Sequence, residues 1–433
     1  MSRTTIPRRG KGRTRENRKA QRAPSARTRF GGREARPTEK QHCRNRGIVR
    51  MTTKTVRIAL NGVTGRMGYR QHLLRSVLAI RDQGGIETAD GGRVTVEPVL
   101  IGRRPEKLAE IARQHDISEW SAELDTVLSD DSVDVYFDSQ ITSARQKALR
   151  SAVEAGKHVY SEKPVSETAE QALELARLAE NAGVCHGVVH DKLFLPGLLK
   201  LHRLLEGGFF GRVLSVRGEF GYWVFEGDWQ SAQRPSWNYR SEDGGGIVSD
   251  MFCHWHYVLE NLFGRVESVT AKATTHVPRR WDERGAVYEA TADDAAYGIF
   301  ELEGGTIAQI NSSWAVRVNR DELVEFQIDG TEGSAVAGLR GCRLQHRTMT
   351  PKPVWNPDLP ATDPFRDQWS EVPDNEEFDN GFKTQWEQFL RDVVGEKKHR
   401  YDFFAGARGI QLAEAGLRSS ASGKRIPLDR LDS

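Results

Sequence analysis

Two residues four positions apart carry the most specific chemical signal in the sequence. A run of three glycines at 244–246 precedes a predicted helix that holds Asp250 and His254. Residues at this spacing share one helix face and can touch. A carboxylate beside an imidazole orients the ring and raises its basicity, which suits a general base near neutral pH. The alternatives are a buried histidine that the aspartate satisfies, and a metal site, although no third ligand stands at a recognised spacing.

A second candidate is Lys163, near the end of the segment Gly-Lys-His-Val-Tyr-Ser-Glu-Lys-Pro at 156–164. The segment is typical of a strand that runs into a loop, and the carboxyl ends of parallel strands are where such sheets bind ligands. A lysine at this place can hydrogen-bond both a substrate oxygen and a cofactor. The alternative is a surface pair of Glu162 and Lys163 before a helix, with Pro164 in the loop.

A glycine-rich turn earlier in the chain predicts where a cofactor would bind. Gly62, Gly65 and Gly68 recur every three residues between a short apolar strand and the start of a helix. Such a turn needs glycine for an unusual backbone angle, for close approach to a pyrophosphate and for close packing of helix on strand. The N–H groups at the helix start then face the phosphates. The alternative is an ordinary strand–helix turn, but its place after the first strand favours a dinucleotide site.

The end of the second predicted strand bears on the choice of coenzyme. In this fold an acid there bonds the ribose 2′-hydroxyl, whereas an arginine accommodates a 2′-phosphate. No acid stands there, and Arg103 and Arg104 follow Gly102. We therefore predict NADP in preference to NAD. The alternative is two solvated arginines that open a helix at Pro105.

Alternating strand and helix patterns must position these residues in the first half of the chain. Strands are predicted at 56–61, 94–101, 133–138, 157–161 and 184–189. Helices are predicted at 66–80, 105–114, 143–155 and 168–182, with a long loop at 81–93. This alternation indicates right-handed parallel crossovers, and so an α/β Rossmann domain with a doubly wound parallel sheet at 51–190.

The pattern changes after residue 190, where a helix is predicted at 193–206. Stretches with a period of two residues follow, at 212–225, 265–277, 294–303, 305–316 and 322–329. Helices are predicted at 380–394 and 404–421. The alternation is typical of antiparallel strands, so we predict an α+β domain at 191–433 with a large, mainly antiparallel open sheet.

Charge and composition set the remaining bounds. Residues 1–50 hold 17 Lys and Arg against three Glu, a net charge of +14, so the rest of the chain carries −11 of the total of +3. We interpret this basic tail as a disordered, solvated extension, with Met51 a candidate start, rather than as a nucleic-acid-binding arm. No apolar run approaches the ~18 residues of a membrane span. Four scattered cysteines without a C-x-x-C pair indicate a cytoplasmic protein without a zinc site.

Four blocks of sequence together resemble the glucose–fructose oxidoreductase and inositol dehydrogenase family, Gfo/Idh/MocA, from about 54 to 422. They are the glycine turn at 62–68, Ala155-Gly-Lys-His-Val-Tyr-Ser-Glu-Lys-Pro164, Phe194-Leu-Pro196 with Gly211-Arg-Val213, and Gly-Gly-x(4)-Asp-x-x-x-His ending at His254. The resemblance implies a Rossmann domain and an open sheet whose exposed face builds homodimers or homotetramers. It implies Lys163, Asp250 and His254 as the catalytic group, and hydride exchange between a nicotinamide and a sugar or polyol carbon.

Three departures from the family pattern lie near the expected site. The family's Thr-Pro-Asn-x-x-His loop is Asp138-Ser-Gln-Ile-Thr-Ser143 here, a small residue is Phe252, and an acid three positions after the histidine is Tyr257. The expected cofactor-binding residues are Gly62, Thr64, Gly65, Arg66, Met67, Gly68, Arg103, Arg104, Ser139, Glu162 and Lys163. The expected substrate-binding residues are Lys163, Trp237, Arg240, Asp250 and His254. No metal ligands are expected.

These observations predict an NADP- or NAD-dependent oxidoreductase acting on a hydroxyl-bearing carbon of a sugar, polyol or related compound. His254 would take the hydroxyl proton, Asp250 would orient that imidazole, and Lys163 would hold the reacting oxygen. One alternative is an imine or lactam reductase, since the turn that begins at Asn61 also resembles that of dihydrodipicolinate reductases. The other is a cofactor-sensing regulator that has lost the chemistry. The pairing of Lys163 with His254 and the long second domain count against the reductase, and the joint presence of Lys163, Asp250 and His254 counts against the regulator.

Overall fold

The computed structural model describes residues 53–360 and 364–431, and the predicted basic tail lies outside them. In the first half of the described chain the strand order is β2-β3-β1-β5-β6-β7, and β4 pairs with the other end of β3. The strands are β1 (Thr53–Asn61), β2 (Ile86–Glu87), β3 (Arg93–Ile101), β4 (Glu119–Ser121), β5 (Val135–Asp138), β6 (His158–Ser161) and β7 (His186–Val188). All pairs are parallel except β2 with β3. The order reverses beside β1, which makes the ends of β1 and β5 the ligand-binding switch point.

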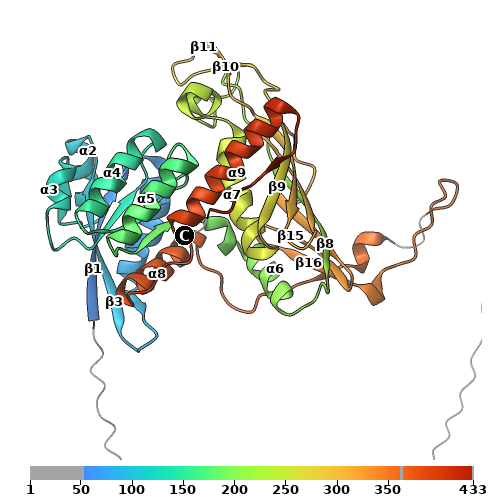
Figure 1. Cartoon of the computed structure of the whole chain (residues 1–433), viewed down its shortest axis with the longest axis horizontal. Helices are drawn as coiled ribbons and strands as arrows, with labels where there is room; N and C mark the ends of the chain where they lie inside the picture. Colours follow the sequence, from blue (N-terminus) through green and yellow to red (C-terminus); the bar gives the residue numbers. More distant parts are fainter. Residues whose placement is uncertain (1–52, 361–363, 432–433) are drawn as a thin grey trace, which may run out of the picture. The chain divides into compact units, whose positions relative to one another are not determined.

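Helices cover both faces of this sheet, and each face has its own hydrophobic cluster. One face carries η1 (Gly68–Leu78), α1 (Ala79–Asp82), α2 (Pro105–Gln114) and α8 (Gly381–Val394). The other carries α3 (Leu124–Leu128), α4 (Thr142–Glu154) and α5 (Ala169–Asn181). Helix α8 returns from the far end of the sequence and buries Trp386 and Phe389 against the first sheet (Figure 1). The predicted boundary near residue 190 stays a prediction.

Glycine shapes the turn after β1 as the sequence predicted. Gly62 has a φ of +88°, and its carbonyl oxygen accepts from the Gly65 N–H at 3.0 Å. A Cβ at Gly68 would lie 2.5 Å from both the Gly62 carbonyl oxygen and Ser139 Oγ. Because the Gly62 oxygen belongs to the main chain, a side chain at this position would force the turn itself to shift.

The helix that follows the turn differs from the expected α-helix at 66–80. It winds as a π-helix over Gly68–Leu78 before the short α1. Ser76 Oγ donates to the carbonyl of Gln71, five residues earlier, at 2.8 Å. That bond fits the wider turn of a π-helix, which often marks a functional region.

The second sheet has the strand order β17-β16-β15-β14-β8-β13-β12-β9-β18 in the part of the chain that the structure describes. Its strands are β8 (Val213–Gly221), β9 (Val266–Thr274), β12 (Ala295–Leu302), β13 (Ile307–Ser313), β14 (Val324–Gly330), β15 (Gly333–Gly338), β16 (Cys342–His346), β17 (Ser370–Glu371) and β18 (Ile426–Pro427). All pairs are antiparallel except β8 with β13. The predicted α/β domain and mainly antiparallel α+β domain are confirmed.

Helices α6 (Pro196–Glu206), α7 (Ile247–Leu262) and α9 (Phe403–Ser422) contribute to one core with the inward residues of this sheet. Asp293, just before β12, fixes the start of α7. Its main-chain oxygen accepts from Ile247 N at 2.9 Å and its carboxylate from Val248 N at 2.8 Å. These bonds satisfy N–H groups that the first turn of a helix leaves free, and they anchor the helix that carries Asp250.

The period-two pattern found the long strands and missed the short ones. Strands β2, β4, β15, β16, β17 and β18 were not predicted, nor was the hairpin of β10 (Arg279–Trp281) and β11 (Val287–Glu289). A strand of two to six residues offers little alternation, and β15, Gly-Ser-Ala-Val-Ala-Gly, also lacks bulky side chains. Within residues 53–360 and 364–431 the remaining elements are the 3-10 turns η2 (Asp191–Phe194), η3 (Ser236–Tyr239), η4 (Ser241–Asp243), η5 (Arg347–Met349) and η6 (Phe365–Gln368).

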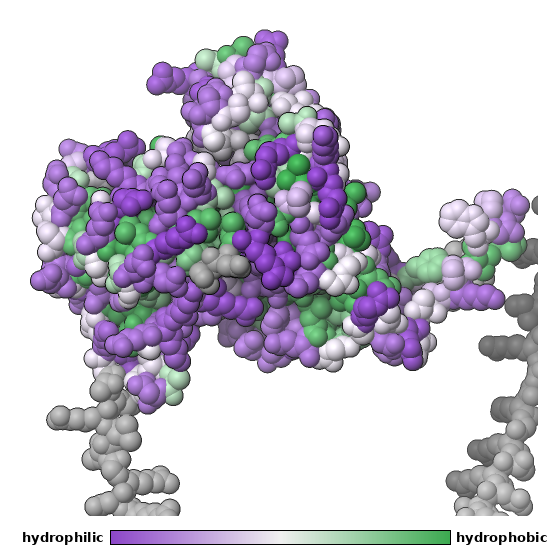
Figure 2. Space-filling model, viewed as in Figure 1, coloured by the Kyte–Doolittle hydropathy of each residue, from purple (hydrophilic) through white to green (hydrophobic). Residues whose placement is uncertain are grey.

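Most of the surface seen in Figure 2 is polar, and apolar residues occupy separate small areas of it. None of the helices in residues 53–360 and 364–431 combines the length and the apolar character that crossing a bilayer requires.

Replacing Gly68 with alanine should damage the cofactor site, because the added methyl group meets the Gly62 carbonyl and Ser139 Oγ at 2.5 Å. Overpacking of this kind costs about 1–3 kcal/mol, so we expect a lower melting temperature and weaker dinucleotide binding by calorimetry. Gly341→Ala is the control, since the nearest atom to its added Cβ would be 3.6 Å away. Normal dinucleotide binding by Gly68→Ala would contradict the role of the turn.

Candidate active site

The predicted cofactor residues at the glycine turn lie together. Ser139 follows β5, and its N–H and Oγ both donate to the Asn61 carbonyl, at 3.0 and 2.9 Å. A Cβ on Gly62 would lie 2.6 Å from Ser139 Oγ. The turn is therefore closed on this side by Ser139. Glycines at 62, 65 and 68 leave the main chain of this turn without a Cβ at three positions, which suits close approach of a pyrophosphate.

Three arginines lie on this turn or just after the neighbouring strand. Arg66 lies on the turn itself, and Arg103 and Arg104 follow β3, the strand paired with β1. All three are exposed, and no ion pair with another described residue occupies them. Thr64 and Met67 are half-buried in the same turn. The residues that directly follow β3, Gly102 to Arg104, thus include two cations and no carboxylate.

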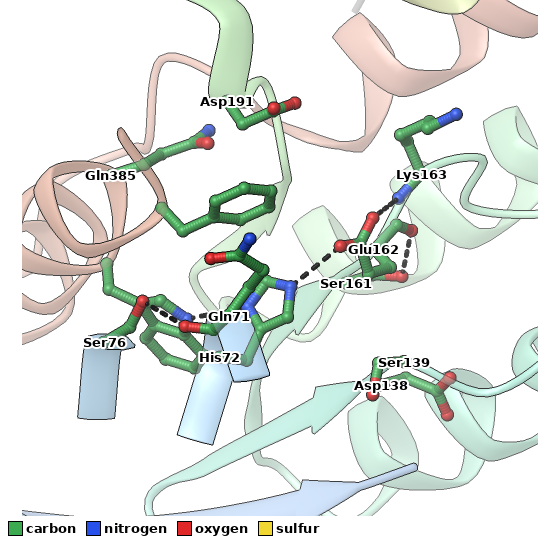
Figure 3. A network of polar contacts seen from close by, with 12 residues as sticks. Gln71, His72, Ser76, Asp138, Ser139, Ser161, Glu162, Lys163, Asp191 and Gln385 are labelled. Atoms are coloured by element: carbon green, nitrogen blue, oxygen red, sulfur yellow. Dashed lines mark hydrogen bonds and ion pairs between the residues drawn. The ribbon is translucent and has the colours of Figure 1, made fainter. Parts of the chain in front are cut away.

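Glu162 makes contacts inside the first domain that the sequence did not predict. Its carboxylate bonds His72 Nε2 at 2.8 Å and accepts from Lys163 N at 3.1 Å (Figure 3). Trp386 Nε1 on α8 donates to His72 Nδ1 at 3.0 Å, which leaves Nε2 as the protonated nitrogen that donates to Glu162. This network ties η1 and α8 to the peptide that precedes Lys163.

The side chain of Lys163 points away from Glu162 (Figure 3) and reaches helix α7. Its Nζ donates to Asp250 Oδ1 at 2.5 Å and to the Asp250 carbonyl at 3.1 Å. Burial would raise the pKa of Asp250, but Lys163 and Arg234 outweigh it and hold that pKa well below its usual range. Burial likewise opposes the charge of Lys163, yet Asp250 raises the pKa of the lysine. The ion pair is therefore charged at neutral pH.

Arg234 is the second cation on this carboxylate. Its Nη1 lies 3.2 Å from Asp250 Oδ2 and its Nε donates to Tyr222 Oη at 3.1 Å. The guanidinium also lies over the Trp314 ring, 4.2 Å from the ring centroid. A cation held by a carboxylate, a phenol and an aromatic face is fixed in place.

His254 is buried on α7, and both its ring nitrogens have partners. Nδ1 lies 2.6 Å from Tyr257 Oη, and Nε2 lies 3.2 Å from Lys192 Nζ. Burial first, then Lys163 and Lys192, hold the pKa of His254 well below its usual value. The imidazole is therefore neutral near pH 7 and can accept a proton.

The expected contact between Asp250 and His254 is wrong. Among the described residues, neither a hydrogen bond nor an ion pair joins them, although both lie on α7. The carboxylate turns to Lys163 and Arg234 because two full positive charges attract it more strongly than a neutral imidazole does. The expected rise in the basicity of His254 is also wrong, because burial first and then nearby cations lower its pKa.

Two of the predicted substrate-binding residues lie outside the cluster formed by Lys163, Asp250, His254 and their polar partners. The Trp237 side chain is 45% exposed in η3, and Arg240 lies over the Tyr288 ring at 4.8 Å and 4.0 Å from Asp243. No hydrogen bond or ion pair in the described chain joins either side chain to Lys163, Asp250 or His254. Their role in substrate binding stays a prediction.

Four polar residues of the cluster were not singled out from the sequence as site residues: Asp191, Lys192, Arg234 and Tyr257. Asp191 and Lys192 come just after β7, and the rule that parallel strands bind ligands at their carboxyl ends could have found them. Arg234 stands in a loop without a regular pattern, so only the folded structure shows it. Tyr257 was noted only as a departure.

Lys163 and His254 differ in what their side-chain nitrogens can do. Lys163 Nζ is a charged donor, and His254 Nε2 faces a donor and so carries a lone pair. Such a pair can hold an oxygen and remove its proton. The glycine turn of the first domain and this cluster are joined through Glu162, the residue before Lys163.

Comparison with known proteins places the chain among oxidoreductases. Residues 56–190 match the family model "Oxidoreductase family, NAD-binding Rossmann fold", and residues 198–336 match "GFO/IDH/MocA C-terminal domain". A D-xylose dehydrogenase of Paenarthrobacter nicotinovorans is 63% identical over 383 residues, 88% of this chain and 99% of that protein.

Solved structures show the same fold at low sequence identity. A levoglucosan dehydrogenase in complex with NADH and levoglucosan superposes with a TM-score of 0.71 at 19% identity, over 87% of this chain and 100% of that one. An NAD binding oxidoreductase from Klebsiella pneumoniae gives a TM-score of 0.72 at 19% identity over the same shares.

These matches support the predicted dehydrogenase rather than the imine reductase or the regulator. The chain is an oxidoreductase with an NAD-binding Rossmann domain that transfers hydride between a nicotinamide and a hydroxyl-bearing carbon. The two family models together cover more than half of its length. The chain therefore belongs to the Gfo/Idh/MocA family of oxidoreductases.

Proposed function

We propose that this enzyme oxidises an aldose, with D-xylose as the first candidate, and that Lys163, Asp250 and His254 form its catalytic group. The 63% identity to a D-xylose dehydrogenase supports the substrate class. The main support for the catalytic group is one contact. A charged Lys163, from the end of β6, bonds Asp250 on α7, the helix that also carries a neutral His254.

The residues have separate tasks in the oxidation direction. His254 Nε2 accepts the proton of the substrate hydroxyl. Lys163 Nζ hydrogen-bonds the reacting oxygen and stabilises the negative charge that develops on it. Asp250 keeps Lys163 charged and directs its amino group, with Arg234 as the second partner of the carboxylate. The nicotinamide, when bound, accepts the hydride.

Lys192 adds a second donor at the same place. Its Nζ lies 3.2 Å from His254 Nε2 and 3.5 Å from Asp191 Oδ2. In this scheme the substrate hydroxyl takes the position of that ammonium on Nε2, and Lys192 turns to a neighbouring hydroxyl of the sugar. A flexible, strongly hydrated ammonium suits such an exchange better than an arginine would.

We propose NADP as the preferred coenzyme. Arg103 and Arg104 are exposed at the end of β3, without a described carboxylate to neutralise them. Gly62, Thr64, Gly65, Arg66, Met67, Gly68 and Ser139 would hold the pyrophosphate side. The rest of the dinucleotide would extend to Lys163, and the network of Glu162 would fix that end.

We also propose a cytoplasmic homodimer or homotetramer. Tyr297, Ile299 and Ile307 are exposed on the face of the second sheet opposite its core, where a second copy of the chain could cover them. The three described cysteines, Cys185, Cys253 and Cys342, are free thiols, which suits a reducing compartment.

Replacing His254 with alanine should lower turnover of D-xylose by roughly 10²–10⁴-fold, because the base is lost. Dinucleotide affinity should stay nearly unchanged, since His254 lies on α7, away from the glycine turn. Steady-state rates and calorimetry measure the two quantities. His256→Ala is the matched control, because His256 is buried on the same helix but contacts Glu260. Near-normal turnover by His254→Ala would refute the assignment.

The pH profile of oxidation provides an independent check. His254 acts only when neutral, so the rate should rise as pH passes upward through its pKa. Because burial and nearby cations lower this pKa, the rise should lie below the ordinary imidazole value of 6.5, and the rate should be level through neutral pH. A rise of kcat centred at or above pH 6.5 that depends on His254 would contradict this electrostatic picture.

Coenzyme preference can be tested by replacing Arg103 and Arg104 with alanine together. Charge-assisted bonds to a 2′-phosphate contribute about 1.5–3 kcal/mol each, so NADP affinity should fall at least about tenfold while NAD affinity changes little. Arg113→Ala, an exposed arginine at the other end of α2, is the control. Equal dissociation constants for the two coenzymes in the unaltered enzyme would rule out the preference.

A further inference from the structure

The inner side of His254, which faces away from the reacting oxygen, has its own chain of polar groups. Nδ1 lies 2.6 Å from Tyr257 Oη, and Tyr257 Oη lies 3.3 Å from Asp191 Oδ1. Lys192 N donates to the same phenol oxygen at 3.3 Å. Asp191 Oδ1 itself lies 3.9 Å from His254 Nδ1.

The number of protons in this chain allows one arrangement. The main-chain N–H of Lys192 can only donate to the phenol, and a carboxylate can only accept. The single phenolic proton of Tyr257 therefore goes to Asp191. The phenol oxygen can then only accept from His254, so Nδ1 must carry the imidazole proton and Nε2 the lone pair.

The outer side of the ring requires the same tautomer. Lys192 Nζ, 3.2 Å from Nε2, is an ammonium without acceptor capacity. Nε2 must accept from it, as it must accept from a substrate hydroxyl later. Two independent partners on opposite sides of His254 thus agree on its protonation state.

Tyr257 and Asp191 are held in place by the residues around them. Tyr257 is buried, and the His190 ring stacks on it at a centroid distance of 4.1 Å. Burial first, then Asp191, raise the pKa of Tyr257 well above its usual value, which keeps its proton in place. Gln385 on α8 accepts from His190 N at 2.8 Å and donates to the Val188 carbonyl at 3.0 Å, and so fixes the segment that leads into Asp191.

We propose that Tyr257 and Asp191 are positioning residues that fix the tautomer of His254 and stabilise the imidazolium formed when it accepts the substrate proton. The proposal rests on the proposed role of His254 as the base. Asp250, by contrast, serves Lys163 and Arg234. The two carboxylates of the site therefore have different tasks, one for the base and one for the lysine.

The charges around His254 set the direction of the expected pH effect. Lys163, from the end of β6, Lys192 of η2 and Arg234 oppose the imidazolium, as does His190. The imidazolium is favoured by the negative charge of Asp191 of η2. On α7 itself, Asp250 and the Tyr257 oxygen also favour it. Removing Asp191 or the Tyr257 oxygen takes away stabilisation of the charged ring, so the pKa of His254 should fall further.

The test uses Tyr257→Phe, Asp191→Asn and the double variant in the full-length enzyme. Each single change should lower kcat for D-xylose about 10- to 100-fold, as loss of a partner that orients a functional histidine does. KM and dinucleotide affinity should change less than about twofold, because the residues touch neither ligand in this scheme. The acid limb of the kcat profile should move to lower pH in each variant. The double variant should lose about as much as the worse single one, because the residues act as one unit.

Tyr401→Phe is the matched control, since Tyr401 is a buried tyrosine beside the same His190 whose hydroxyl has no hydrogen bond within the described residues. It should keep kcat and the acid limb of the unaltered enzyme. Should Tyr257→Phe fail to fold, Asp191→Asn, at a more accessible position, still decides the matter.

Nitrogen NMR of histidine-labelled protein gives a readout that does not depend on turnover. The His254 signals, assigned by their loss in His254→Ala, should show a proton on Nδ1 in the unaltered protein. In Tyr257→Phe the share of this tautomer should fall, because only Lys192 then favours it. A proton on Nε2 in the unaltered protein would overturn the proposal. A second result would also overturn it: Tyr257→Phe and Asp191→Asn both keep a normal kcat and an unmoved acid limb, while His254→Ala loses turnover. His254 would then remain the base, without help from the other two residues. Normal turnover by His254→Ala would instead overturn the proposed function.

Discussion

The carboxylate of Asp250 lies between two cations, and the site depends on this arrangement. Lys163 comes from the end of a parallel strand in the first half of the chain and Arg234 from a loop of the second half. Without Asp250 these two positive charges would face each other in a partly buried space, where repulsion is screened less than in water. The aspartate thus joins a residue of the first half of the chain to one of the second half, within the proposed catalytic site. It also keeps Lys163 charged beside the helix that carries the neutral His254.

Helix α8 supplies the framework behind this arrangement. It belongs to the last part of the sequence, yet Trp386 packs in the core of the first sheet and donates to His72. Gln385, its neighbour, holds the segment that follows β7. Two adjacent residues of one helix therefore steady both Glu162, next to Lys163, and the turn that bears Asp191 and Lys192. Buried polar networks of this kind tend to fix one geometry because each unpaired group would be costly.

The sequence predicted the fold, but not how Lys163, Asp250 and His254 pair. Long strands and helices carry enough periodicity to be found, and the spacing of Gly62, Gly65 and Gly68 indicated the turn. Helix spacing correctly placed Asp250 and His254 on one helix. It could not show that Lys163 and Arg234 compete for the carboxylate, because they arrive from 87 and 16 residues away along the chain. The acid expected three residues after His254 is replaced by Tyr257, and Asp191, distant in sequence, provides the missing carboxylate through it.

The most direct test of the central claim follows the transferred hydrogen itself. The enzyme would be given NADP and an aldose that carries deuterium on the carbon to be oxidised, and the reduced nicotinamide would be analysed by mass spectrometry. If the cluster around Asp250 is the reacting centre, the nicotinamide gains one deuterium per product, and Asp250→Asn transfers it far more slowly while it still binds the coenzyme. Deuterium transfer by Asp250→Asn at the rate of the unaltered enzyme, or product without deuterium on the nicotinamide, would contradict the account.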